Sequence, residues 1–325
     1  MSRISRYQDS MNKFIKNKSC VKIINDSEVR GNIYKMIDRH GDYVASIILL
    51  ATINIQSKKN NLKLHGYYIG CGIELLMIVA KIFNNKLYFE ELYGKEMVAK
   101  IVNKIITTVN ICLSQNIKSI QNSITKDKAL KIIHTCMKIL NTKLNYLIND
   151  ENLEVSGNMK RSDLVKYNFT STGVAKSLSG LQQVKQEGLL NFVENKFGIV
   201  CQLAIILGWL LGGGDEKWIS TLEQLGTYLG YIIKISNDCL TLEEDMKEAI
   251  SGISESRKTY NLLINLGIQD SFELFINSKT KFIEGCMSLN IYTNTIKEIL
   301  DLVEVQLDKM IDNVTPDLKS AYTLT

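Results

Sequence analysis

Apolar residues recur at helical spacing along almost the whole chain, which has 325 residues. The stretch 66–83 is apolar on most faces and predicts a buried helix, whereas 95–124 carries an apolar stripe and predicts an amphipathic one. Strict alternation of apolar and polar residues is absent, so no sheet is expected. The pattern predicts an all-α, single-domain helical bundle over 1–325. The main helices are expected at 43–56, 66–83, 95–124, 126–148 and 197–211.

The net charge is +5, and the segment 1–26 is basic. A basic segment of this kind is either an arm that binds a nucleic acid or a membrane surface, or the solvated face of a first helix. No basic repeat interleaved with aromatic residues is present, so the second interpretation is favoured and nucleic acid is not an expected partner. The apolar run 199–214 is broken by Gln202 and ends in glycines, which predicts a buried helix and no transmembrane segment.

Seven cysteines are scattered along the chain, and no two have the C-x-x-C spacing. Because the number of cysteines is odd and their spacing suggests no pairs, the sequence predicts reduced thiols and a cytoplasmic protein. The three histidines, at 40, 65 and 134, lie too far apart in the sequence to predict a zinc site.

Two helices of the second half carry more specific motifs. KFGIVCQLAIILGWLLGGGDE begins at Lys196 and ends in a glycine stop, and LEQLGTYLGYIIKISNDCLT places Asp238 in an otherwise apolar helix. These stretches resemble the Lys-Thr helix and the second aspartate-rich helix of the trans-isoprenyl diphosphate synthases (polyprenyl synthetases) and of the related class I terpene synthases. YVASIILLA and GIELLMIVAKIFNN match earlier helices of that family. The resemblance covers 35–265, with a poorly matched middle at 95–190, and implies an isoprenoid-synthase-like bundle around a central cavity.

The resemblance implies a chemistry that needs carboxylates, because Mg²⁺ bridges them to the departing diphosphate. The first carboxylate clamp would fall on Asn84, Asn85 and Tyr88, none of which is anionic. An amide oxygen ligates Mg²⁺ but adds no negative charge. Glu90 and Glu91 replace the clamp only if the helix end is shifted in register; otherwise they are a solvated acidic pair. The first motif is therefore interpreted as degenerate.

The stretch that grips the second, homoallylic diphosphate in the family is also altered. Gly41, Asp42 and Val44 stand where the family has three basic residues, and ELYGKE replaces the arginine pair after the first motif. The resemblance therefore predicts that this chain does not condense isopentenyl diphosphate with an allylic diphosphate.

The second clamp keeps one family aspartate, Asp238, while Lys234 stands where the family usually has glutamine. Asn237, Thr241 and Asp245 lie near one helical face at i, i+4 and i+8 and resemble the metal-binding triad of terpene synthases. Amide, hydroxyl and carboxylate oxygens suit Mg²⁺. The alternative interpretation is a polar stripe on an amphipathic helix.

Two lysines match family residues that bind diphosphate, namely Lys196 and Lys258. Each is otherwise an ordinary surface lysine. Tyr68, Phe83 and Tyr88 are either the lining of an apolar prenyl cavity or, as aromatic residues at helical spacing usually are, part of the core.

Two functions follow from these alternatives. The favoured hypothesis is a divergent isoprenoid-synthase-fold protein that has lost chain elongation and acts as a binding, regulatory or structural protein, without a cofactor. The alternative is an active class I terpene synthase or prenyltransferase that ionises an allylic diphosphate such as farnesyl diphosphate, with Mg²⁺ at the second-helix triad. Asn84 and Asn237 are expected to face each other across the cavity. A homodimer is expected through the apolar stripe of 95–117.

Overall fold

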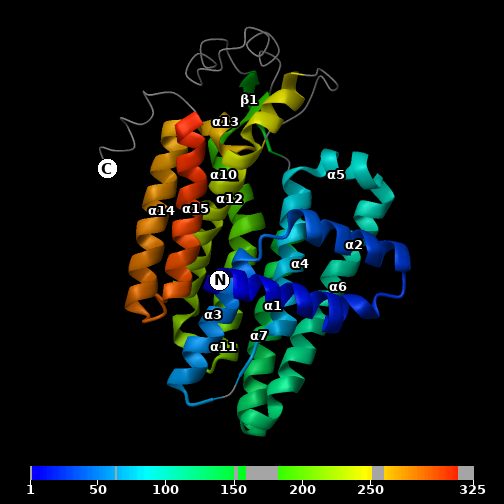
Figure 1. The fold of residues 1–325 in the computed structure, drawn as a ribbon, viewed down its shortest axis with the longest axis vertical. Coiled ribbons are helices and arrows are strands. Elements are labelled where there is room, and N and C mark those ends of the chain that lie inside the picture. Colours follow the sequence, from blue (N-terminus) through cyan, green and yellow to red (C-terminus); the bar gives the residue numbers. More distant parts are fainter. Residues whose placement is uncertain (1, 63, 150–152, 159–181, 251–259, 314–325) are drawn as a thin grey trace. The chain divides into compact units, whose positions relative to one another are not determined.

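The computed structural model describes residues 2–62, 64–149, 153–158, 182–250 and 260–313. Its elements are α1 (Arg3–Lys18), η1 (Cys20–Ile23), α2 (Ser27–His40), α3 (Val44–Lys59), α4 (Tyr67–Asn84), α5 (Lys86–Tyr93), α6 (Lys95–Ile120), η2 (Gln121–Ser123), α7 (Lys126–Ile148), β1 (Val155–Asn158), β2 (Gln182–Val184), α10 (Gln186–Val193), η4 (Glu194–Gly198), α11 (Ile199–Leu211), η5 (Glu216–Trp218), α12 (Ile219–Ile250), α13 (Leu262–Leu266), α14 (Ile268–Ser288) and α15 (Asn294–Asn313), as labelled in part in Figure 1. The predicted all-α class is confirmed.

Two compact units make up the chain, each assembled from separate segments. The first unit comprises Met1–Asn149, Asn195–Gly230 and Phe282–Ile299. The second unit comprises Asp150–Glu194, Tyr231–Lys281 and Leu300–Thr325. The single domain over 1–325 stays a prediction, and so does the expectation that Asn84 faces Asn237, because these two residues belong to different units.

The core of the first unit is built on three very apolar helices. All thirteen residues of α11 are buried, and α11 packs against α3, α4 and α7. In turn, α4 packs against α3 and α6. Helices that are apolar on every side must be covered by other helices, and this arrangement covers them.

Glycines allow α11 to lie very close to its neighbours. A Cβ atom at Gly226 of α12 would lie 2.3 Å from Cα of Gln202, and one at Gly230 would lie 2.6 Å from Cα of Gly198. On the α3 side, a Cβ at Gly208 would lie 2.9 Å from the carbonyl oxygen of Leu49. Because real Cβ atoms do not approach so closely, glycine at these positions sets the spacing of the helices.

The amphipathic helix α6 packs its apolar stripe against other helices of the first unit. Its buried residues include Ile101, Ile105 and Leu113, and it packs against α2, α4, α5 and α7. The stripe proposed above as a dimer interface is therefore already covered within the chain. Similarly, the basic helix α1 buries Ile4, Met11 and Ile15, which agrees with the interpretation of a solvated first helix rather than a free arm.

The second unit contains the one departure from helical structure seen in the described residues. β1 and β2 pair in antiparallel orientation, with Val155 opposite Val184. The expectation that no sheet would form was therefore wrong for this short pair. The strands are only four and three residues long, too short to show an alternating pattern.

Three helical stretches among the described residues are long and apolar enough to cross a membrane by length and composition, at Tyr67–Asn84, Lys95–Ile120 and Gln186–Leu211. In the α4 stretch, 72% of the residues are buried inside the protein. The absence of a transmembrane segment stays a prediction.

Candidate functional site

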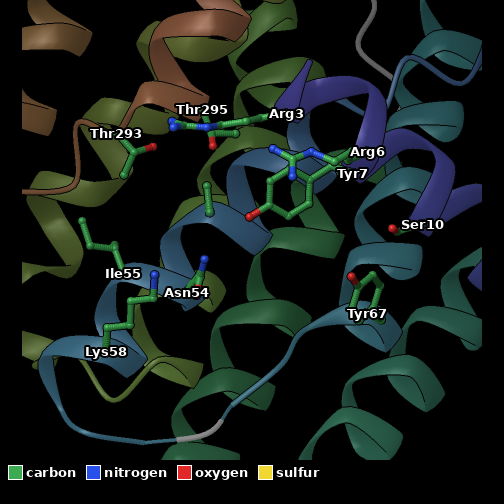
Figure 2. A pocket seen from close by; sticks show the side chains of 11 residues that line it. Arg3, Arg6, Tyr7, Ser10, Asn54, Ile55, Lys58, Tyr67, Thr293 and Thr295 are labelled. Carbon is green, nitrogen blue, oxygen red and sulfur yellow. The ribbon is translucent and has the colours of Figure 1, made fainter. Parts of the chain in front are cut away.

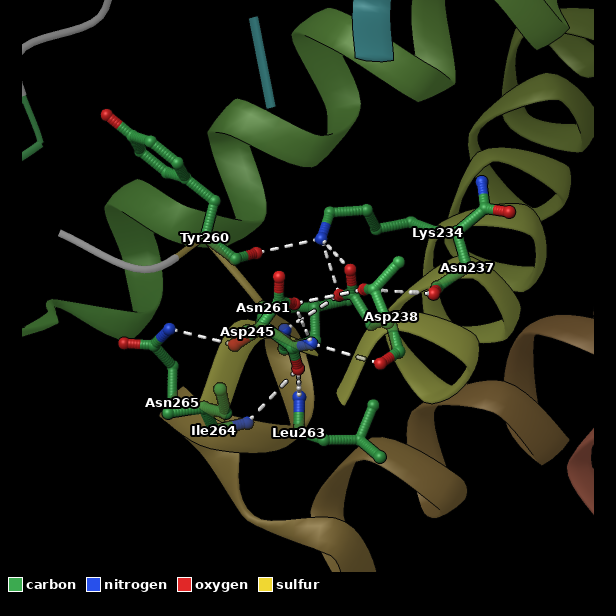
Figure 3. Close-up of polar contacts among 11 residues, drawn as sticks. Lys234, Asn237, Asp238, Asp245, Tyr260, Asn261, Leu263, Ile264 and Asn265 are labelled. Atoms are coloured by element: carbon green, nitrogen blue, oxygen red, sulfur yellow. Dashed lines mark hydrogen bonds and ion pairs between the residues drawn. The ribbon is translucent and has the colours of Figure 1, made fainter. Parts of the chain in front are cut away.

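Two oppositely charged residues of α12 form a buried ion pair. Lys234 and Asp238 are one helical turn apart, so their side chains lie on the same face, and their exposed fractions are 0% and 1%. The Lys234 ammonium group is bound to both carboxylate oxygens of Asp238 and donates a further hydrogen bond to the carbonyl oxygen of Tyr260, at 2.8 Å (Figure 3). These contacts use the three donors of the ammonium group.

Asp238 accepts one more hydrogen bond, from the backbone N–H of Leu262 at 2.7 Å. Burial raises the pKa of Asp238 to about 6, and the charge of Lys234 and the hydrogen bond from Leu262 partly offset that rise. The cation that balances Asp238, the aspartate matched by the resemblance, is thus a lysine of the same helix.

The predicted triad is brought together only in part. The Thr241 hydroxyl lies 3.0 Å from Oδ2 of Asp245, to which it donates, and the Asn261 amide donates to the same oxygen at 2.7 Å. The side-chain nitrogen of Asn237 is buried and has no hydrogen-bond partner among the described residues. Figure 3 shows the side-chain amide of Asn237 pointing away from the cluster around Asn261, while its backbone carbonyl accepts a hydrogen bond from the Thr241 hydroxyl at 3.2 Å.

Asn261 organises this cluster, although sequence reasoning assigned it no role. It caps α13 by accepting hydrogen bonds from the N–H groups of Leu263 and Ile264, and its amide also donates to the backbone carbonyl of Asp238 at 3.0 Å. The signal in the sequence is an Asn immediately before a short apolar run, a common helix N-cap.

The described residues of this cluster fit Mg²⁺ poorly. Asp245 is the only carboxylate of the triad, and its Oδ2 already accepts two hydrogen bonds. The carboxylate of Asp238 is held by Lys234, whose positive charge would repel a dication. Mg²⁺ sites in proteins rely on carboxylates and substrate phosphates. No group of three or more His, Cys, Asp or Glu residues in the described part of the chain is arranged to hold a metal.

Lys196 is a buried residue of the first unit, and its exposed fraction is 1%. Its ammonium group donates to the carbonyl oxygens of Leu147 at 2.8 Å and Asn149 at 2.5 Å, and it lies 4.7 Å from the ring centroid of Phe83. The interpretation as a surface lysine is wrong. The lysine instead binds the carbonyls at the C-terminal end of α7, where a cation is favourable. Its predicted contact with diphosphate stays a prediction, and Lys258 lies outside the described residues.

The degenerate first motif lies where α4 ends and α5 begins. Asn84 is the last residue of α4, Asn85 separates the two helices, and Tyr88 belongs to α5. The side-chain oxygen of Asn84 is buried without a hydrogen-bond partner in the described structure. Tyr88 packs edge-on against His40 and Phe89, with centroids 6.3 Å and 5.3 Å apart.

The structure also shows where the nearby acidic pair and the aromatic side chains of the sequence analysis lie. Glu90 and Glu91 follow on α5, beyond the break in the helix. Tyr68 packs edge-on against Phe14, with ring centroids 4.9 Å apart, and Phe83 lies beneath the Lys196 ammonium. These contacts agree with the interpretation of the aromatic residues as packing groups.

The stretch that replaces the second-substrate grip forms an internal ion pair. Oδ2 of Asp42 lies 2.7 Å from the ammonium of Lys81, which also donates to the carbonyl of His40 at 2.7 Å. Oδ1 of Asp42 accepts from the N–H of Val44 at 2.9 Å and so satisfies a donor at the start of α3. A Cβ atom at Gly41 would lie 2.6 Å from the carbonyl oxygen of Ile37. An acidic side chain thus stands where the family presents cations.

A fully buried carboxyl group, Glu74 of α4, lies beside this ion pair. Its oxygens accept hydrogen bonds from the N–H of Tyr43 at 3.3 Å and the hydroxyl of Ser46 at 2.8 Å. Burial raises the pKa of Glu74 to about 7, and the charge of Asp42 adds to that rise. Sequence reasoning missed Glu74, although one acidic residue inside an otherwise apolar helix was a visible signal.

No protein family matches the sequence, and comparison with curated proteins gives no relative. Solved structures do match. A Helicobacter pylori geranyltransferase complexed with magnesium and isoprenyl diphosphate superposes with a TM-score of 0.57 at 14% identity, covering 94% of this chain and 96% of that one. An FPP/GFPP synthase from Zymomonas mobilis gives 0.56 at 11% identity, with 92% and 95% covered. The chain has the trans-isoprenyl diphosphate synthase fold.

A geranyltranstransferase from Thermotoga maritima shares this fold, with a TM-score of 0.54 and 12% identity over 96% of this chain and 100% of that one. The fold predicted from the resemblance is therefore confirmed. Identity this low establishes the trans-isoprenyl diphosphate synthase fold alone, so the chemistry has to be argued from the residues of this chain.

Proposed function

We propose that this chain is a non-catalytic member of the trans-isoprenyl diphosphate synthase fold that acts as a binding, regulatory or structural subunit. The observation that carries the proposal is the buried pair of Lys234 and Asp238. The lysine supplies, from within the protein, the positive charge that a metal ion would supply to this aspartate in an active relative. A site that neutralises its own carboxylate has little charge left to hold Mg²⁺.

Two further features support the loss of activity. Asn84 and Asn85 are uncharged at the first motif, and Asp42 is paired with Lys81 where the second substrate would need cations. Removal of a single well-placed electrostatic group typically lowers the rate on the order of 10²–10³-fold. Several such losses would place condensation below detection even if their effects are not additive.

A subunit role is compatible with the assemblies that this fold forms. A mint geranyl pyrophosphate synthase with a TM-score of 0.50 to this chain, at 14% identity, is heterotetrameric. We propose that this chain also associates with itself or with a related chain in the cytoplasm. The seven cysteines, all free and buried, are consistent with a reducing compartment. Light scattering that gives a monomer mass at micromolar concentration would argue against the homodimer.

The test of the proposal is incubation of the purified chain with labelled isopentenyl and farnesyl diphosphates, with and without Mg²⁺. The Thermotoga maritima geranyltranstransferase serves as the positive control. We expect no product from this chain. A longer prenyl diphosphate would refute the proposal. A cyclic hydrocarbon from farnesyl diphosphate alone would establish the terpene synthase alternative, and Asn237→Ala and Asp245→Ala should then abolish it.

A further inference from the structure

A pocket of about 540 Å³ opens on the first unit, and none of the candidate-site residues described above lines it (Figure 2). It is lined by two helix faces of matching periodicity. α1 contributes Arg3, Arg6, Tyr7 and Ser10, and α3 contributes Ala51, Asn54, Ile55 and Lys58. In both helices the spacing is i, i+3, i+4 and i+7, so each set lies along one face.

The pocket gathers positive charge with little to balance it. Arg3, Arg6 and Lys58 all line it. The Nε atom of Arg3 lies 3.9 Å from a carboxylate oxygen of Glu298, and the N–H of Arg3 donates to Glu298 as well. The charged groups of Arg6 and Lys58 have no ion-pair partner among the described residues. A concave surface with excess positive charge attracts anions.

The neutral residues of the pocket add hydrogen-bond donors and an apolar wall. Thr295 lines the pocket and adds a hydroxyl group to it. Ser10 and Tyr7 add further hydroxyls, and Ile55 and the ring of Tyr67 add apolar surface. Figure 2 shows the side chains of Arg3, Arg6 and Tyr7 on the same side of the pocket as Thr295.

The pocket is separate from the positions matched to the family's diphosphate sites. It uses the C-terminal part of α3 and the first residue of α4, whereas Val44 and Asn84 lie at the opposite ends of these helices. At a rise of 1.5 Å per residue, Tyr67 and Asn84 are about 25 Å apart along α4.

We propose that this pocket binds a small molecule that carries a phosphate or diphosphate group. Two guanidinium groups present planar pairs of donors that match phosphate oxygens, and Lys58 adds a point charge. The volume suits a phosphate ester with a modest organic group, which would rest on Ile55 and Tyr67. The basic character of 1–26 thus gains a specific role in two of its arginines.

The proposal is tested by calorimetry of the full chain with sodium diphosphate in the absence of Mg²⁺. We expect saturable binding that weakens as salt is raised. Arg6→Gln and Lys58→Gln should each weaken binding about tenfold or more, because each removes a charged hydrogen bond. Lys13→Gln, an exposed lysine of α1 outside the pocket, is the matched control and should bind as the wild type does. Arg6→Lys, which keeps the charge, should retain part of the affinity.

Co-sedimentation with phosphatidylcholine vesicles, with and without phosphatidic acid, distinguishes a free phosphate ester from a lipid headgroup. Vesicle binding that needs phosphatidic acid and is lost in Arg6→Gln/Lys58→Gln supports the proposal with a lipid as the source of the phosphate. The proposal is overturned if neither probe binds, or if the double variant, folded by circular dichroism, binds both as the wild type does. Because neither residue belongs to the α12 cluster, these results do not depend on whether the chain is catalytic.

Discussion

At the residue scale, Lys234 neutralises the aspartate that matches a family metal-binding motif. The resemblance matched Asp238 to an aspartate of the family's second motif and Lys234 to a position where the family usually has glutamine. It did not predict that the two would form a buried pair, because the burial of both depends on the tertiary packing around Tyr260 and Leu262. The i, i+4 spacing of opposite charges was visible, but on most helices such pairs are exposed.

Removal of Lys234 should expose how much the pair depends on both partners. Lys234→Met leaves an uncompensated buried carboxyl group, and loss of one member of a buried pair typically costs about 3–5 kcal/mol in the free energy of unfolding. Lys234→Met/Asp238→Leu should cost clearly less than the two single changes added together. Urea unfolding of the three variants measures this coupling.

The exposed pair of Glu96 and Lys100 is a matched control, because it has the same i, i+4 spacing, with 2.7 Å between its charged atoms. Its double-mutant cycle should show negligible coupling. A coupling as small for Lys234 and Asp238 would contradict the assignment of a buried, mutually dependent pair.

Glu74 should make the stability of the protein depend on pH in an unusual direction. Its pKa is raised from 4.5 to about 7, so between these values the folded chain keeps a proton that the unfolded chain has lost. The free energy of unfolding contributed by this group is therefore present below pH 4.5 and is lost as pH rises through 7. The loss is about 3–4 kcal/mol when each pKa unit counts as about 1.4 kcal/mol.

Glu74→Gln should flatten this dependence and stabilise the protein above pH 7. The amide is accommodated because the Ser46 hydroxyl, relieved of Glu74, has the carbonyl oxygen of Gly70 within 3.0 Å as another acceptor. Urea unfolding at pH 5 and pH 8 measures the change, and Glu187→Gln on the exposed face of α10 is the control. A variant with the same pH slope as the wild type would show that Glu74 is not the group responsible.

At the element scale, most of the helices could be predicted and the strands could not. The periodicity of 66–83 and 126–148 predicted α4 and α7 nearly to the residue. A helix can be recognised from the periodicity of its own residues. The pairing of β1 with β2 joins segments more than twenty residues apart, and neither strand alone is long enough to reveal it.

The packing of α12 on α11 should be sensitive to one methyl group. Gly226→Ala would place a Cβ atom 2.3 Å from Cα of Gln202 and 2.4 Å from its nitrogen, so the helices would have to separate. Overpacking of a core typically costs about 1–3 kcal/mol. Gly31→Ala in the middle of α2 meets no atom within 4 Å and should stabilise the protein by about 0.5–1 kcal/mol. Circular dichroism during urea unfolding compares the two, and equal effects would contradict close packing at Gly226.

At the scale of the whole molecule, the fold was predictable because it needs only the succession of helices and a few register matches. The candidate site was less predictable, because its residues change role according to what lies beside them. Lys196 matched a family position in the sequence, yet its side chain is buried against the end of α7. A shared fold therefore says where the site lies, while the neighbours of each side chain decide what it does.

The response of the whole chain to Mg²⁺ separates the two functional hypotheses without an assay of product. A ligand that binds only the folded state raises its stability according to its concentration relative to Kd, by about 2.7 kcal/mol at one hundred times Kd. In the described cluster Thr241 and Asn261 donate to the carboxylate of Asp245 and Lys234 holds Asp238, so millimolar Mg²⁺ should leave Tm unchanged relative to EDTA. The measurement is a thermal melt with Mg²⁺ alone and with Mg²⁺ plus farnesyl diphosphate. A rise in Tm that needs Mg²⁺ and disappears in Asp245→Asn, but not in the exposed control Asp215→Asn, would mean that the triad holds metal after all, and the catalytic alternative would then take precedence.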